Sequence, residues 1–108
     1  AKQLAEMNRK GDIIGCIVDG PFALDNAISK EAALTKGISS DVAGDADVLL
    51  VPHIDAGNIL YKSLVFLAKA KSAGIILGTK APIVLTSRAD DGESKLYSIA
   101  LGVISASK

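Results

Sequence analysis

Short apolar runs rich in β-branched residues alternate along the chain with longer segments in which apolar residues recur at helical spacing. The runs predict buried strands near Gly15–Asp19, Val48–Val51, Ile75–Gly78 and Ile83–Leu85. The most strongly marked helical segment begins at Ile59, where Leu60, Leu64 and Leu67 form one apolar row. This alternation predicts an α/β fold, with helices packed on a parallel or mixed sheet.

One stretch late in the chain joins a predicted strand, a polar loop and a predicted helix. The chain changes from apolar to polar over residues 86–88, directly after the last strand. Asp90 and Glu93 have the spacing of a helix N-cap and the third helical residue, which predicts that the helix begins just past Asp90. Ligands of open α/β sheets bind where strands end, and the free N–H groups of a helix N-terminus favour anions.

Arg88 is one of two arginines in the chain, against ten lysines. Its position beside Thr86 and Ser87 suits a phosphate or carboxylate, because a guanidinium binds such groups with two parallel hydrogen bonds. The alternative interpretation is that Arg88 pairs with Asp90 or Asp91 on a solvated turn. The two carboxylates are candidate general bases if a thiol or hydroxyl binds nearby, or else helix-capping groups.

Composition and charge exclude several functional classes. Twelve basic and twelve acidic residues cancel, so we expect neither nucleic acid nor an anionic membrane as a partner. No apolar run approaches the length of a membrane span, and a cytoplasmic location is expected. A single cysteine, Cys16, and a single histidine, His53, make a metal site unexpected. A triad of Ser87, His53 and Asp55 is arithmetically possible, but the local signature is missing.

A series of short motifs occurs in one order along the chain. They are Asp19-Gly20-Pro21 with Asp25, Ala43-Gly44 with Ala46 to Leu50, Ala56-Gly57-Asn58 with Tyr61-Lys62, and Ala81-Pro82 with Ser87-Arg88. Together these motifs resemble the phosphate acyltransferases, which move an acyl group between coenzyme A and inorganic phosphate. Residues 85–90 and 98–101 resemble the phosphate butyryltransferase branch more than the phosphate acetyltransferases.

The resemblance implies a three-layer αβα sandwich of the isocitrate/isopropylmalate dehydrogenase type, with the active site in a cleft between two domains. Members of the family are much longer than 108 residues, so the resemblance implies that residues 1–108 are a C-terminal portion. On this basis, residues from 1 to about 80 belong to one α/β domain. Residues from about 81 to 108 form a closing strand and helix at the cleft.

The function that the resemblance implies is transfer of a butyryl or related short or branched acyl group from acyl-CoA to phosphate, giving acyl phosphate and CoA. Coenzyme A is then a substrate, no cofactor or metal is permanently bound, and the protein is expected to form a homo-oligomer. The 108-residue piece is expected to turn over poorly by itself. Two alternatives stay open: a phosphate- or CoA-binding module without chemistry, and a self-associating structural piece.

The family places a serine–arginine pair near the phosphate and the thiol end of coenzyme A, and Ser87 and Arg88 match that pair. The acetyltransferases carry an acidic base several residues later, where this chain has Ser94. Asp90 or Asp91 is therefore expected to act as the base. The residues expected to bind coenzyme A are Thr86, Ser87, Arg88, Asn58 and Tyr61.

Overall fold

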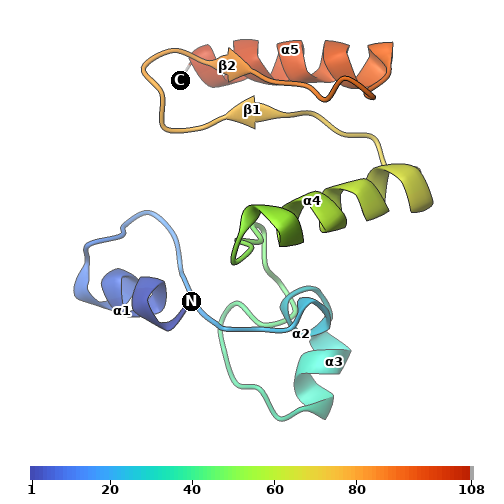
Figure 1. Ribbon diagram of the computed structural model, residues 1–108. Helices are drawn as coiled ribbons and strands as arrows, with labels where there is room; N and C mark the ends of the chain where they lie inside the picture. The colour runs from blue at the N-terminus through green and yellow to red at the C-terminus, as the bar shows by residue number, and fades with distance from the viewer. Residues whose placement is uncertain (108) are drawn as a thin grey trace. The chain divides into compact units, whose positions relative to one another are not determined.

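The computed structural model describes residues 1–107, which contain five α-helices, one π-helical segment and two short strands (Figure 1). In chain order these are α1 (Lys2–Lys10), α2 (Leu24–Ile28), α3 (Lys30–Thr35), α4 (Ile54–Lys62), η1 (Ser63–Leu67), β1 (Ile75–Ile76), β2 (Ile83–Val84) and α5 (Gly92–Ala106). The chain divides into two compact units, residues 1–54 and residues from 55 onward. The α/β class is confirmed, and each unit is described by itself below.

In the first unit, the segment after α1 is held by a side chain and does not form the strand predicted near residues 15–19. The Asn8 amide donates hydrogen bonds of 2.9 Å each to the backbone oxygens of Ile13 and Cys16. Its Oδ1 accepts a 3.0 Å bond from the backbone N–H of Val18. Because Asn8 occupies these backbone groups, they are not available to a strand ladder.

The short helices α2 and α3 form the rest of the first unit together with the segment that follows them. Ser29 caps α3 by accepting a 3.2 Å bond from the backbone N–H of Ala32. Gly44 lies against α3 with φ of +80°, and a β-carbon there would come within 2.5 Å of the Cα of Lys30. Only glycine fits this close approach. The strand predicted near residues 48–51 is absent from the described part of the unit.

In the second unit, β1 and β2 pair as antiparallel strands, with Ile75 opposite Val84 and Ile76 opposite Ile83. The two strands lie where the apolar runs predicted them, although both are shorter. The prediction of a parallel or mixed sheet is wrong for this pair. Residues 77–82 connect the strands, and such a short connection can only join antiparallel neighbours, since a parallel crossover needs a dozen residues or more.

Helix α5 runs alongside the two strands (Figure 1). Gly102 permits this packing, because a β-carbon at that position would come within 2.8 Å of Cγ2 of Val84. The helix begins one residue later than predicted. Asp91, and not Asp90, is the N-cap residue, and its carboxylate accepts a 2.8 Å bond from the backbone N–H of Ser94.

The segment after α4 is a π-helix, and it interrupts the apolar row predicted for this region. Its wider turn is marked by a 3.1 Å bond from the backbone N–H of Ala68 to the oxygen of Ser63. A π-turn takes up an extra residue, so the positions beyond it rotate away from the face that α-helical spacing predicts. Leu67, at the end of the predicted row, is 81% exposed.

Ser98 joins α5 to the chain that enters β1. Only 1% of its surface is exposed. The hydroxyl accepts a 2.9 Å bond from the backbone N–H of Gly74 and donates a 2.7 Å bond to the oxygen of Ser94. The serine therefore provides the hydrogen-bond partner that the Gly74 N–H needs next to the helix.

We expect Ser98→Ala to lower the free energy of unfolding by about 1–3 kcal/mol, because the partly buried Gly74 N–H loses its acceptor. Urea denaturation measures the change. Ser107→Ala is the matched control, since Ser107 is exposed and bonds only to carbonyls of its own helix. Equal effects of the two substitutions would show that the Ser98 bond does not stabilise the unit.

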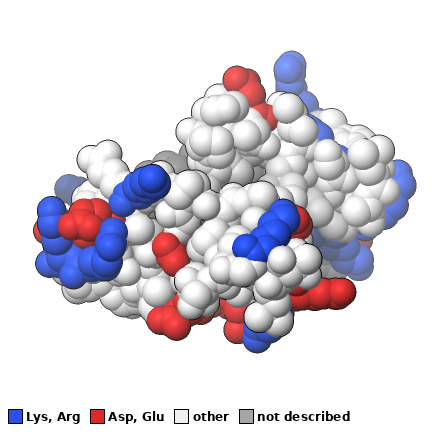
Figure 2. Space-filling view, turned by 90° about the horizontal axis from the view of Figure 1, so that it is seen from below, with Lys and Arg blue, Asp and Glu red and all other residues white. Residues whose placement is uncertain are grey.

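Charged side chains of both signs are interspersed on the surface. On the face shown in Figure 2, Asp and Glu side chains lie among Lys and Arg side chains, with broad uncharged areas between them. Within α1, for example, Glu6 pairs with Arg9 at 2.8 Å. None of the helices in residues 1–107 combines the length and hydrophobicity that crossing a bilayer requires.

Candidate functional site

A cavity of about 420 Å³ in the second unit is lined by α4, the chain entering β1, and the loop that follows β2. Five residues predicted for the site line this cavity, namely Tyr61, Thr86, Ser87, Arg88 and Asp90. The other lining residues are Gly74 and Leu85. Of the remaining predicted residues, Asn58 is exposed on α4 and Asp91 caps α5, and neither contributes to the lining.

The loop from Ser87 to Asp90 is a closed turn held by two hydrogen bonds. The backbone N–H of Ser87 donates a 2.7 Å bond to Oδ2 of Asp90. In return, the backbone N–H of Asp90 donates a 3.1 Å bond to the oxygen of Ser87. This reciprocal pair fixes the backbone on either side of Arg88.

Tyr61 of α4 holds the same carboxylate. Its hydroxyl donates a 2.8 Å bond to Oδ1 of Asp90, so Asp90 links α4 to the backbone of Ser87. A hydrogen bond with Ser72 lowers the pKa of Tyr61. The bond to Asp90, burial, and the charges of Asp90 and Asp91 act in the opposite direction. Together they raise the pKa of Tyr61 above its usual value. The phenol therefore stays protonated near neutral pH and remains a donor.

The hydroxyl of Ser87 is surrounded by donors. Its Oγ accepts a 3.3 Å bond from the ammonium of Lys62 and a 3.4 Å bond from the backbone N–H of Ala89. A hydroxyl has two acceptor lone pairs and one donor, so its hydrogen is left for another acceptor. Within residues 1–107, no carboxylate or imidazole accepts that hydrogen. The hydroxyl is consequently arranged to donate to an incoming oxygen atom, and no base activates it as a nucleophile.

Arg88 extends from the turn as an exposed side chain that lines the cavity. In the described part of the chain, no carboxylate forms an ion pair with its guanidinium, although Asp90 and Asp91 follow closely in sequence. The solvated Arg88–Asp pair weighed from the sequence is therefore not formed. The planar donors of Arg88 are available to an anion.

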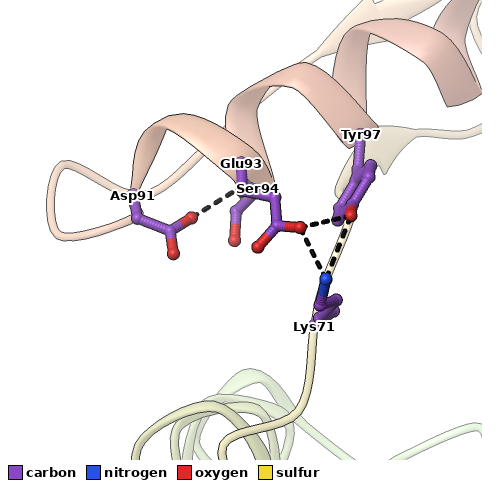
Figure 3. Close-up of polar contacts among 5 residues, drawn as sticks. All are labelled: Lys71, Asp91, Glu93, Ser94 and Tyr97. Carbon is purple, nitrogen blue, oxygen red and sulfur yellow. Dashed lines mark hydrogen bonds and ion pairs between the residues drawn. The ribbon is translucent and has the colours of Figure 1, made fainter.

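Asp91 points to the helix and not to the turn. In Figure 3, its carboxylate meets the backbone of Ser94 at the start of α5. Hydrogen bonds from the backbone and side chain of Ser94 hold the pKa of Asp91 below its ordinary value, and the charges of Lys71 and Lys95 lower it further. Asp91 thus stabilises the helix that follows the loop.

A second polar cluster involves the first two turns of α5 (Figure 3). Lys71 pairs with Glu93 at 2.6 Å and donates a 3.3 Å bond to the hydroxyl of Tyr97, which itself donates to Glu93. The hydrogen bond from Lys71, followed by the one from Tyr97, lowers the pKa of Glu93. These contacts tie the segment before β1 to α5 and leave Lys71 occupied.

The family profile described as "Phosphate acetyl/butaryl transferase" matches residues 1–103. The chain belongs to this family. Within the family, it is 67% identical over 103 residues to the phosphate acetyltransferase of Thermotoga maritima, and 66% identical over 103 residues to a probable phosphate butyryltransferase of Bacillus subtilis. These alignments cover 95% of this chain but only 35% and 34% of the two relatives.

A solved structure has a similar fold. The branched-chain phosphotransacylase of Enterococcus faecalis aligns with a TM-score of 0.81 and 47% identity, covering 95% of this chain and 37% of that one. The chain therefore spans about a third of the length of the family members it matches. Relatives named for acetyl and butyryl transfer match almost equally, so the identities do not separate the two branches.

Lys62 contacts the site through Ser87, although it was not predicted from the sequence as a site residue. It follows Tyr61 on α4, and the two side chains reach the Ser87 turn at different atoms. The only signal in the sequence is the Tyr61-Lys62 pair in one of the short motifs. Lysine at the end of an amphipathic helix ordinarily indicates a solvated face.

Proposed function

We propose that the protein is an acyltransferase that moves a short or branched acyl group between coenzyme A and inorganic phosphate. The observation that carries this proposal is the turn at Ser87 and Arg88, where a guanidinium without an ion-pair partner and a hydroxyl with a free hydrogen line one cavity. Membership of the phosphate acetyl/butyryl transferase family supports the same reaction. Phosphate and acyl-CoA are the proposed substrates.

In the proposed reaction, an oxygen of phosphate attacks the carbonyl carbon of the thioester. The carbon–sulfur bond then breaks, and coenzyme A leaves as a thiolate that takes up a proton. Arg88 stabilises the charge on phosphate and on the developing oxyanion, and Ser87 donates a hydrogen bond to the same centre. Neither role requires a covalent intermediate on Ser87.

In the reverse direction, a base removes the proton from the thiol of coenzyme A, and the thiolate attacks the acyl phosphate. We assign this base to Asp90, since it lines the cavity, whereas Asp91 caps α5. Each oxygen of Asp90 accepts one hydrogen bond from the protein, which leaves lone pairs for a proton. Thr86, Tyr61 and Asn58 complete the proposed contacts to coenzyme A.

We further propose the wider architecture that the family resemblance implies. In it, residues from 1 to about 80 belong to one α/β domain of a three-layer αβα sandwich, and residues from about 81 to 108 close the interdomain cleft. The likeness to the Enterococcus faecalis structure supports this arrangement. A cytoplasmic homo-oligomer is proposed as well, and the exposed apolar side chains of Leu96, Ile99 and Val103 on α5 support self-association.

The proposal predicts that the full-length protein releases free thiol from acyl-CoA only when phosphate is present. A thiol-reactive dye measures this release for acetyl-, butyryl- and branched acyl-CoA. Omitting phosphate is the control, and it should abolish release because phosphate is the nucleophile. Release that does not depend on phosphate would indicate hydrolysis and contradict the proposal. Thermal stabilisation by coenzyme A without turnover would instead indicate a binding module.

A further inference from the structure

We propose that Lys62 binds the phosphate group that is exchanged in the reaction, next to the hydroxyl of Ser87. This inference rests on the proposed acyltransferase function and adds a substrate-binding residue to it. The ligand chemistry is a tetrahedral phosphate carrying two negative charges, as in inorganic phosphate or acyl phosphate. Two observations lead to it. Lys62 contacts Ser87, and its ammonium forms no ion pair among residues 1–107.

The position of Lys62 places a cation directly beside the cavity. Its Nζ lies 3.3 Å from Oγ of Ser87, which lines the cavity. The ammonium also lies over two aromatic rings, 4.8 Å from the centre of Tyr61 and 5.3 Å from that of Phe66. The rings favour the cation and restrict the stem, so Nζ is kept at one end of the turn.

The charge of Lys62 has no counterpart among residues 1–107. Four of the described lysines are paired with carboxylates, among them Lys71 with Glu93 at 2.6 Å and Lys36 with Asp25 at 2.7 Å. The other described lysines without an ion pair are exposed to solvent, and in this they differ from Lys62. Lys62 is half-buried and forms no ion pair in the described residues. A partly desolvated ammonium is stabilised by an anion, and in this site the anion is the substrate.

The hydrogen-bond donors of Lys62, Ser87 and Arg88 together suit one kind of ligand. An ammonium has three N–H donors, and Lys62 uses one of them on Ser87. The free hydrogen of Ser87 and the guanidinium of Arg88 lie on the same turn. A phosphate offers several acceptor oxygens and can take hydrogen bonds from all three side chains, whereas a carbonyl oxygen cannot. Lys62 contacts Ser87, which in the proposed reaction donates to the reacting centre. The phosphate bound by Lys62 is therefore the one that is exchanged, and not one of the phosphates of coenzyme A, which lie far from the thiol.

A purely positioning role for Lys62 makes a different prediction. Tyr61 and Lys62 both bond to the turn, and if Lys62 only held Ser87 in place, its loss would lower kcat for both substrates. If Lys62 contacts phosphate, its loss must raise the KM for phosphate selectively. The two roles are therefore separated by the split between KM and kcat.

The experiment compares Lys62→Gln and Lys62→Arg in the full-length protein with both substrates varied. Losing a charge-assisted hydrogen bond should raise the KM for phosphate about ten- to a hundredfold in Lys62→Gln. The KM for acyl-CoA should stay within about twofold. Lys62→Arg keeps the charge and should recover most of the phosphate affinity. Lys80→Gln is the matched control, because Lys80 is exposed in the connection between β1 and β2.

Binding measured without turnover tests Lys62 even if the acyltransferase assay fails. Inorganic phosphate should raise the Tm of wild-type protein and of Lys80→Gln, and this rise should be lost in Lys62→Gln. The inference is overturned by an unchanged KM for phosphate in Lys62→Gln, by a selective rise in the KM for coenzyme A, or by an undiminished Tm shift. A wild-type protein that binds phosphate through Lys62 but transfers no acyl group would contradict the proposed function alone.

Discussion

Replacing Arg88 by lysine should lower kcat by about 10²–10³-fold, because one donor aimed at developing charge is typically worth that much. Lysine keeps the charge but loses the planar fork that binds two oxygens at once. Arg88→Gln should be worse, since the charge is lost as well. Steady-state kinetics with both substrates varied measures the effect, and the fall in kcat should exceed any rise in KM if Arg88 acts mainly in the transition state.

Arg9→Lys provides the control for Arg88. Arg9 is exposed on α1 and pairs with Glu6 of the same helix, so its replacement should leave the kinetics unchanged. A kcat within about threefold of wild type for both Arg88 variants would identify Arg88 as an ordinary surface residue. The proposed role of the turn would then be wrong, whatever the outcome for Lys62.

Asp90→Asn should lower kcat by about 10²–10⁴-fold, the range that general-base catalysis supplies. The amide cannot take a proton from the thiol of coenzyme A. It also cannot accept from both the Tyr61 hydroxyl and the Ser87 N–H as the carboxylate does, because one end of the amide is a donor.

Asp91→Asn is the matched control for Asp90, since asparagine caps helices about as well as aspartate. It should leave both kcat and stability close to wild type. Equal effects of the two substitutions would contradict the assignment of the base to Asp90.

The second unit was predicted from the sequence more fully than the first. The apolar runs near Ile75 and Ile83 do form strands, and the helical spacing after Asp91 does form α5. The direction of the strands was missed, because hydrophobic pattern specifies burial but not pairing partner. The N-cap was displaced by one residue, since adjacent aspartates offer the same chemistry and only the backbone decides between them.

The strand predicted near residues 15–19 in the first unit failed for a different reason. Asn8 bonds to backbone groups five to ten residues away, and no local pattern signals such a contact. For the site, residue types together with the family resemblance predicted Ser87, Arg88 and Asp90, and these three residues line the cavity. Lys62 belongs to one of the motifs that carry the resemblance, but its contact with Ser87, 25 positions later, could not be predicted from local spacing.

The turn at Ser87 is attached to α4 at two points, through consecutive residues of one helix. Tyr61 holds the carboxylate of Asp90, and Lys62 holds the hydroxyl of Ser87. Consecutive helical side chains point about 100° apart, so the two bonds restrain the turn from different directions. Moving the whole turn away from α4 therefore requires both bonds to break, and substrates meet a loop that is anchored before they arrive.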